Sequence, residues 1–236
     1  MALRPPPRRS LPATLLAGIL WTSAQAEPLA LSFGLTSATV LRGVALGEGG
    51  VDPHAAASYA DESGWRATLA STALHSEPSQ QRWDAQLFWR VGYAHRLRED
   101  WSAQLAYAGY SYPGSEYLRR YGHDELGATL AYRDLLYLSV AGLRRDDAGS
   151  SGNRNGMAYD IVARHPLPAA VTASAGLGRV DTRGSSFAYN YGHLGLDAQW
   201  GATQAQLSYI GTDSAAKRRF GEAASNRWTA SLAWSY

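Results

Sequence analysis

The last nine residues, Trp228-Thr-Ala-Ser-Leu-Ala-Trp-Ser-Tyr236, decide the fold class. Apolar and aromatic residues occupy every second position from Trp228 to Tyr236, and Thr, Ser and Ala occupy the positions between them. On a β-strand, successive side chains point to opposite faces, so this segment has one apolar face and one small, polar face. A helix would mix the two sets of residues. The segment is therefore predicted to be a strand of an amphipathic sheet.

The same alternation recurs along the chain, for example from Trp83 to Trp89 and from Trp101 to Tyr107. Tight turns and longer polar loops alternate strictly between these segments, which is typical of an up-and-down meander. We expect about twelve strands, near residues 29–42, 52–61, 65–75, 83–96, 101–112, 122–133, 136–144, 157–165, 169–180, 189–200, 203–212 and 227–236. An even number of strands places both ends of the meander on the side of the short turns.

The N-terminal segment has the three parts of a secretory signal peptide. A basic stretch ends at Arg8-Arg9, an apolar stretch runs from Leu11 to Trp21, and Ala24-Gln25-Ala26 supplies small residues for cleavage. We therefore predict a cleaved signal peptide over residues 1–26 and a single β-barrel domain over residues 27–236. The length of 236 residues suits one all-β barrel of this kind.

Composition excludes several classes of function. The chain has no cysteine, which excludes disulfides, thiol nucleophiles and thiolate metal sites. Of its 22 basic and 20 acidic residues, Arg4, Arg8 and Arg9 lie in the predicted signal peptide, so the remainder has no basic excess. A nucleic-acid partner is therefore not expected, because such partners require a basic face. The histidines and acids show no metal-ligand spacing, and no cofactor is expected.

Three features favour a transmembrane barrel over a secreted β-sandwich. The predicted strands have the roughly 9 to 12 residues that a tilted strand needs to cross the hydrocarbon core. The apolar faces of these strands carry almost no charge. Because an open sheet edge would leave backbone groups unpaired in lipid, the sheet is expected to close into a barrel. Aromatic residues also gather at strand ends, as in interfacial girdles. The girdle on the short-turn side comprises Trp65, Tyr93, Trp101, Tyr132, Trp200, Trp234 and Tyr236, that on the long-loop side comprises Trp83, Tyr191 and Trp228, and Trp89 faces lipid in mid-strand.

Several motifs, in order, resemble one group of outer-membrane proteins. They are Thr36-Ser37 with Arg42-Gly43-Val44, Pro53 and Tyr59 with Ser63-Gly64-Trp65 and Ser71, Tyr110-Ser-Tyr-Pro-Gly114, Gly122-His-Asp-Glu125 and Pro166-Leu-Pro168. Taken together they resemble the TorF family of proteobacterial porins. The sequence departs from that family at Val40-Leu41, where an aromatic is commoner, and at Ala45-Leu46-Gly47, which replaces a polar stretch.

The resemblance implies a bacterial outer-membrane barrel with a transport role. We expect periplasmic termini, and contact with outer-membrane lipids and lipopolysaccharide. Tyr236 resembles the C-terminal aromatic that the barrel-insertion machinery reads.

The parity opposite to the apolar one is expected to line the lumen. On that phase eleven charged residues point inward: Arg42, Arg66, Asp84, Arg90, Arg96, Glu125, Arg133, Asp160, Arg164, Asp197 and Arg227. Eight strands leave an interior that side chains just fill, and 16 to 18 leave an open channel, so about twelve strands predict a narrow pore. The excess of arginines predicts a weak preference for anions. The alternative is that these charges pair with one another and form a plug.

The predicted function is a porin-like channel for passive diffusion of small hydrophilic solutes, and not an enzyme. The alternatives are a non-conducting barrel, structural or receptor, and a lipid-modifying enzyme. An enzyme would need Ser and His in contact near the outer rim. The candidates are His75 with Ser71 or Ser76, and His193 near Asn190. The run Lys217-Arg218-Arg219 could bind lipopolysaccharide phosphates, gather anionic solutes or be a solvated loop tip, and we favour the solvated loop tip.

Overall fold

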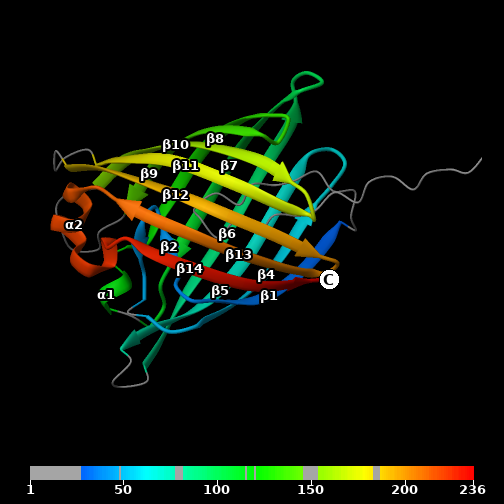
Figure 1. The fold of residues 1–236 in the computed structure, drawn as a ribbon. Coiled ribbons are helices and arrows are strands. Elements are labelled where there is room, and N and C mark those ends of the chain that lie inside the picture. The colour runs from blue at the N-terminus through cyan, green and yellow to red at the C-terminus, as the bar shows by residue number, and fades with distance from the viewer. Residues whose placement is uncertain are drawn as a thin grey trace, which may run out of the picture.

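A computed structural model describes residues 28–236 except 48, 78–81, 115, 120, 146–153 and 183–186. The predicted signal peptide lies outside the described residues. Twelve strands form one closed antiparallel barrel (Figure 1), which confirms the predicted fold class. The barrel strands are β1 (Leu29–Thr36), β4 (Asp52–Ala60), β5 (Trp65–Glu77), β6 (Arg82–Arg96), β7 (Trp101–Ser111), β8 (His123–Tyr132), β9 (Leu136–Arg145), β10 (Arg154–Leu167), β11 (Val171–Thr182), β12 (Phe187–Trp200), β13 (Thr203–Thr212) and β14 (Arg227–Ser235).

The barrel is an up-and-down meander in which each strand pairs with the next one in the chain. It closes through β1, which pairs with β14 on one side, where Phe33 faces Trp234, and with β4 on the other, where Phe33 faces Ala55. Closure satisfies the backbone groups of every barrel strand, which is the condition for crossing hydrocarbon with strands.

The two ends of the barrel differ. At one end, which we call the turn end, five tight turns join the strands, and the C-terminus lies there (Figure 1). The other end, which we call the loop end, carries α1 (Glu116–Arg119), α2 (Ser214–Phe220) and the 3-10 helix η1 (Gly221–Ala224). No helix among the described residues has the length and apolarity needed to span a membrane.

One turn lies a little later than predicted. The sequence places a turn at Pro166-Leu-Pro168, but β10 continues to Leu167 and β11 begins at Val171. The two residues with positive φ are Ala169 (61°) and Ala170 (57°). Three residues, Pro168, Ala169 and Ala170, therefore join the two strands, and the last two of them adopt the left-handed conformation.

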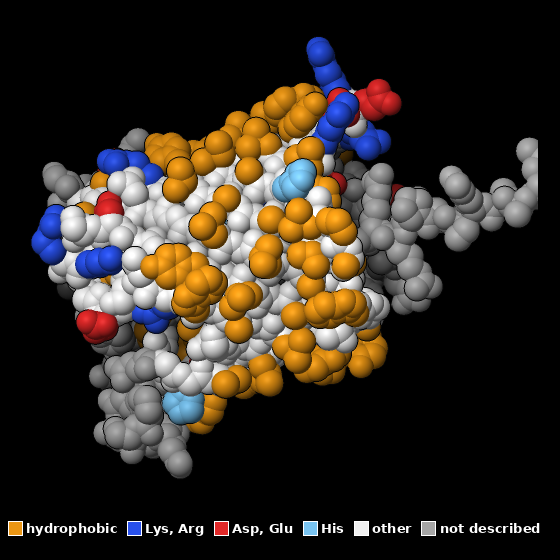
Figure 2. Space-filling view, in the orientation of Figure 1, with side chains coloured by type: hydrophobic (Ala, Val, Ile, Leu, Met, Phe, Trp, Pro, Cys, Tyr) orange, Lys and Arg blue, Asp and Glu red, His pale blue; other side chains and the backbone are white. Residues whose placement is uncertain are grey.

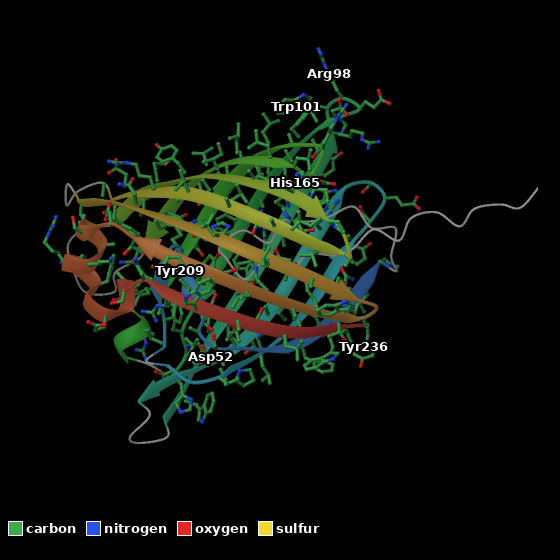
Figure 3. The ribbon with its side chains drawn as sticks, viewed as in Figure 1. Asp52, Arg98, Trp101, His165, Tyr209 and Tyr236 are labelled. Atoms are coloured by element: carbon green, nitrogen blue, oxygen red, sulfur yellow. The ribbon has the colours of Figure 1, made fainter. Side chains whose placement is uncertain are left out.

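The outer wall of the barrel is apolar between its two ends (Figure 2). Aromatic pairs mark both borders. Trp65 packs against Tyr93 and Trp101 against Tyr132 at the turn end, with ring centroids 5.4 Å and 5.0 Å apart. At the loop end Tyr209 packs against Trp228 at 5.2 Å. Figure 3 shows Trp101 and Tyr236 towards one end and Tyr209 towards the other. Such girdles are characteristic of transmembrane barrels.

The prediction that Tyr191 belongs to the aromatic girdle was wrong. The side chain of Tyr191 is buried and its hydroxyl donates a hydrogen bond to Asp160, so the ring points into the lumen. Tyr191 shares its parity on β12 with the buried residues Tyr189 and Asp197, whereas Leu194 and Leu196 on the other parity are exposed. Trp89 does lie on the outer wall, against Tyr107.

The first strand is shorter than predicted. The sequence predicts one strand over residues 29–42, but β1 ends at Thr36. The chain then forms a separate two-stranded hairpin from β2 (Val40–Leu41) and β3 (Val44–Ala45). This hairpin does not extend the barrel wall. Its residues pack on side chains that point into the lumen, as the next subsection describes.

Candidate functional site: a hairpin inside the lumen

The tip of the β2–β3 hairpin is a two-residue turn at Arg42 and Gly43. Both residues have positive φ, 48° and 82°. Glycine adopts this conformation easily, but an arginine does so at a cost of about 1 to 3 kcal/mol that the surroundings must offset. A Cβ atom on Gly43 would lie 2.6 Å from Thr212 Cγ2 and 2.8 Å from Tyr191 Cβ. The tip is therefore pressed against the inner faces of β12 and β13.

Arg42 at the hairpin tip forms a bidentate ion pair with Glu125 on β8. Its Nη1 atom donates to Oε1 at 2.6 Å and its Nη2 atom donates to Oε2 at 2.9 Å. The two side chains are 6% and 11% exposed. This parallel arrangement is the strongest geometry available to an arginine and a carboxylate. It joins the tip to a strand 83 residues away in the chain.

Glu125 has a second basic partner, His123, on the same strand. His123 Nε2 lies 2.8 Å from Glu125 Oε1, and His123 Nδ1 lies 2.7 Å from the Tyr121 carbonyl oxygen. The imidazole also stacks on the ring of Tyr110 from β7, with centroids 4.7 Å apart. We call Arg42, Glu125 and His123 the latch.

The base of the hairpin is fixed by Asp52, the first residue of β4. Asp52 Oδ2 accepts hydrogen bonds from the Thr39 backbone N–H at 3.0 Å and from the Thr39 hydroxyl at 2.8 Å. Its Oδ1 accepts from the His75 backbone N–H at 3.1 Å. Asp52 itself is 2% exposed. In the ring of twelve strands, β4, β8 and β12 are each four strands apart. The hairpin contacts all three, through Asp52, Glu125 and Tyr191, and therefore lies across the lumen.

Apolar contacts surround the hairpin on three sides. Leu46 packs with Leu74 of β5, with Tyr112 and with Leu118 of α1. Val44 packs in a second cluster, formed by Ala158, Val180, Tyr189 and Tyr191 from β10, β11 and β12 together with Ala216 and Ala224 from α2 and η1. On the third side, Val40 and Ala45 pack on Ile210 of β13. The hairpin is thus a packed stopper near the loop end of the lumen.

The lumen wall away from the stopper is polar. The side-chain atoms Ser174 Oγ, His193 Nε2, Gln199 Oε1 and Ser208 Oγ are buried and have no hydrogen-bond partner among the described residues. Buried polar atoms are normally paired, with water where no protein group is near. Gly195 lies between two of these atoms, since a Cβ there would be 2.8 Å from Ser174 Oγ and 2.9 Å from Ser208 Oγ. This part of the lumen, on β11–β13, therefore requires water.

Residues 22–236 match the model of a family described as "Bacterial protein of unknown function (Gcw_chp)". The chain belongs to the Gcw_chp family. The resemblance to the TorF family stays a prediction. No curated protein matches the sequence.

Two solved structures with a similar fold are porins. The "KdgM porin" is 8% identical with a TM-score of 0.57, and the match covers 88% of this chain and 99% of that chain. The "NanC porin" structure is 13% identical with a TM-score of 0.56, covering 88% and 97%. At such low identity the likeness is one of fold, and this Gcw_chp chain therefore has a porin-like barrel.

In this Gcw_chp barrel four of the predicted lining residues lie near one another at the stopper. Arg42 and Glu125 form the ion pair, and the charge of Arg90 on β6 acts on Glu125. Asp160 on β10 lies within electrostatic reach of Arg42 and Glu125 and accepts the hydrogen bond from Tyr191. Asp84 is buried at 6% exposure on β6, near the loop end.

The other predicted lining residues lie elsewhere. Arg66, Arg96 and Arg164 are near the turn end of β5, β6 and β10, and Asp197 is buried near the turn end of β12, where the charge of Arg164 acts on it. Arg227 donates to the carbonyl oxygens of Glu222 and Ala223, at 2.6 Å and 3.2 Å, and so fixes η1.

Arg133 differs from the expectation. It lies in the turn after β8 with a positive φ, and its side chain is 57% exposed. It forms a bidentate pair with Asp100 of the neighbouring turn, at 2.7 Å and 2.9 Å. The pair joins two turns at the rim of the barrel, because the strand has already ended at Tyr132.

The histidine and serine candidates for catalysis are not brought into contact. Ser71 and His75 share the outer parity of β5 but are four residues apart, about 13 Å along a strand. His193 is half-buried on the inner parity of β12, whereas Asn190 is exposed on the other parity and binds Asp213. The side chain of Ser76 is not among the described ones. Within the described residues no group of His, Asp and Glu is arranged to hold a metal ion.

Sequence reasoning missed the hairpin, Asp52, His123 and Tyr191 as parts of the site. The available signal was the apolar stretch Ala45-Leu46-Gly47, which departs from the polar loop of the TorF family. An apolar stretch in a loop needs a surface to cover it. Together with the turn-forming Arg42-Gly43 pair, it indicates a hairpin that folds inward.

Proposed function

We propose that the protein is a porin-like channel of the bacterial outer membrane, through which small hydrophilic solutes diffuse, with the β2–β3 hairpin as the element that controls passage. The observation that carries this proposal is a closed barrel with an apolar wall and a polar lumen that requires water. The porin-like fold supports it. One similar structure is titled "KdgM porin in complex with disordered oligogalacturonate", with 9% identity and a TM-score of 0.54.

The proposal includes a weak preference for anions. Arg66, Arg96 and Arg164 outnumber Asp197 near the turn end of the lumen. A ring of arginines lowers the energy of an anion in a narrow pore and raises that of a cation. The preference is weak because Asp197 offsets part of this charge.

We place the turn end, with both termini, in the periplasm and the loop end outside the cell. The loop-end girdle and the residues around α2 then face lipopolysaccharide, and Tyr236 at the turn end is available to the barrel-insertion machinery. Lys217, Arg218 and Arg219 lie in the last turn of α2. Arg219 stacks over the Phe187 ring at 6.0 Å, which supports a role in fixing α2 on the barrel rim.

A second candidate is a non-conducting barrel. The observation that favours it is the stopper, whose apolar contacts and latch hold residues 38–46 in the lumen. The two candidates differ in what happens when the hairpin is removed.

Planar-bilayer recordings on the refolded barrel test the proposal, using the wild type and a variant in which residues 38–46 are replaced by a short Gly-Ser linker. Conductance steps in the wild type, enlarged in the linker variant, would support a controlled channel.

A second pair of variants tests whether narrowing the lumen lowers conductance. Ala106→Trp places an indole among the inner residues of β7, where Gly92 and Gly127 flank it, and should lower conductance. The matched control Ala128→Trp, on the outer wall, should not. Silence from both folded proteins, wild type and linker variant, would overturn the proposal.

A further inference from the structure

The contacts of His123 call for two hydrogen-bond donors on one ring. Both ring nitrogens face oxygen atoms, one on the Tyr121 carbonyl and the other on the Glu125 carboxylate. A carbonyl oxygen only accepts, so Nδ1 must carry a proton. Glu125 Oε1 already accepts from Arg42 Nη1, so it behaves as an ionised acceptor towards Nε2 as well. An imidazolium ion, in which both nitrogens donate, satisfies both contacts at once.

The latch is therefore one carboxylate held between two cations of different kinds. Arg42 keeps its charge at every pH a cell meets, whereas histidine is the side chain that ordinarily changes charge between pH 5 and 8. A neutral imidazole has only one N–H. Loss of the proton would turn a lone pair towards either Glu125 or the Tyr121 carbonyl and break one of the two contacts.

The other groups that face the latch do not share this behaviour. Tyr110 of β7 presents its ring face to His123, and Arg90 of β6 acts on Glu125. Asp160 of β10 and Tyr191 of β12 face Arg42 from the far side. Arg145 of β9 lies over the Tyr121 ring at 5.8 Å. Among these described neighbours only His123 belongs to a residue type that ordinarily titrates between pH 5 and 8.

We propose that His123 is a proton-sensitive element of the latch, which holds the hairpin in the lumen when protonated and weakens that hold when neutral. The inference rests on the proposed function, because protonation of His123 can change the flow of solutes only if the hairpin controls a conducting path. The direction is fixed by the geometry. Acid strengthens the latch and closes the barrel, and neutral or basic conditions favour displacement of the hairpin.

Two measurements on the refolded full barrel test this between pH 5.5 and 8. The first is the open probability in planar bilayers. The second is amide hydrogen exchange of residues 37–51, corrected for the intrinsic pH dependence of exchange. Losing one charge-assisted hydrogen bond changes an equilibrium by roughly tenfold or more. We therefore expect the open probability and the corrected exchange to rise about tenfold from pH 5.5 to 8.

Three variants separate His123 from other causes. His123→Gln stays neutral and can donate one N–H to Glu125, so we expect a high open probability that does not depend on pH. His123→Arg keeps a cation, so we expect a low open probability at both pH values. The control His193→Gln changes a lumenal histidine of β12 that does not contact the latch and should keep the wild-type response.

The outcomes distinguish the latch from the channel. A wild type whose open probability and corrected exchange are both flat across this range overturns the latch, even if it conducts. A silent barrel whose hairpin exchange still depends on pH, and loses that dependence in His123→Gln, supports the latch and counts against the channel. Equal responses in His193→Gln and His123→Gln would assign the effect to the lumen in general and overturn the role of His123.

Discussion

Arg42→Ala is the perturbation whose consequence follows most directly from the structure. Alanine removes both guanidinium hydrogen bonds to Glu125, of 2.6 Å and 2.9 Å, and removes the only arginine at the hairpin tip. Glu125 then keeps His123 as its basic partner. The carboxylate is 11% exposed and cannot recover its lost hydrogen bonds fully from bulk solvent.

The expected magnitude follows from these facts. Removing one partner of a buried ion pair costs about 3 to 5 kcal/mol. The lower end applies, because the remaining contact with His123 and the polar lumen both compensate Glu125. A cost of about 3 kcal/mol shifts the docked-to-displaced equilibrium by roughly a hundredfold. A hairpin displaced for about 1% of the time would then be displaced for about half of it.

The assay is single-channel recording together with hydrogen exchange of residues 37–51, on protein whose barrel is verified by its folded migration in gels. Arg133→Ala is a matched control, because it removes another bidentate arginine pair, the one with Asp100, at the rim and far from the hairpin. The control should leave hairpin exchange unchanged. A folded Arg42→Ala protein with wild-type open probability and wild-type exchange would refute the role of the ion pair in holding the hairpin.

Three further changes test other parts of the same arrangement. Asp52→Asn replaces a buried acceptor of three hydrogen bonds with an amide, so it should destabilise the hairpin base by about 1 to 3 kcal/mol. Amide hydrogen exchange over residues 37–51 should become faster. The control Asp61→Asn, in a turn at the other end of the barrel, should leave this exchange unchanged. Asp213→Ala removes the N-cap of α2, whose Oδ1 accepts from the Ala216 N–H at 2.9 Å, and should lower stability of the loop-end helices by about 1 kcal/mol. Burial acts to raise the pKa of Asp213, but the N–H groups of Ala216 and Asn190 outweigh it and hold the pKa below its usual value. This stabilisation is therefore present above the ordinary carboxyl pKa and is lost as pH falls through the lowered one, so wild type and Asp213→Ala should differ in thermal unfolding at neutral pH and converge in strong acid. Gly178→Ala places a methyl group against the ring of Tyr191 and the carboxylate of Asp160, so it should disrupt their hydrogen bond. A shift of the Tyr191 ring signals in the NMR spectrum would report this loss.

The barrel itself could be predicted from the sequence because its signal is local. Each strand alternates between lipid and lumen, so a window of about ten residues contains the evidence for its own strand. The segment from Trp228 to Tyr236 was predicted as a strand over 227–236 and forms β14 over Arg227–Ser235. Even there one residue was assigned to the wrong face. Tyr191 was predicted to be a girdle residue because it is aromatic and near a strand end, but its parity on β12 places it inside, against Asp160.

The docking of the hairpin could not be predicted in the same way, because its partners are not local. The sequence places Val40-Leu41 in the first strand, but Arg42 and Gly43, with their positive φ, turn the chain back. What holds it in the lumen comes from residues far away in the chain, such as Glu125 on β8 and Ile210 on β13. The sequence of residues 37–51 taken alone does not indicate that Glu125 and Ile210 lie next to the hairpin.

The hairpin also changes which charges can select solutes. Counting inward arginines treats each as equally available to a solute. In the structure, Arg42 is neutralised by Glu125, Arg227 is used by carbonyl oxygens of η1, and Arg133 is paired at the rim. A solute that entered the lumen from the turn end would first meet Arg66, Arg96, Arg164 and Asp197. If the hairpin is displaced, Arg42 leaves Glu125, and the two charges no longer cancel at one place. If the protein conducts as we propose, we expect selectivity and gating to be coupled: the state that opens the lumen would also expose the Glu125 carboxylate to the solute, and this would reduce the proposed preference for anions at the turn end.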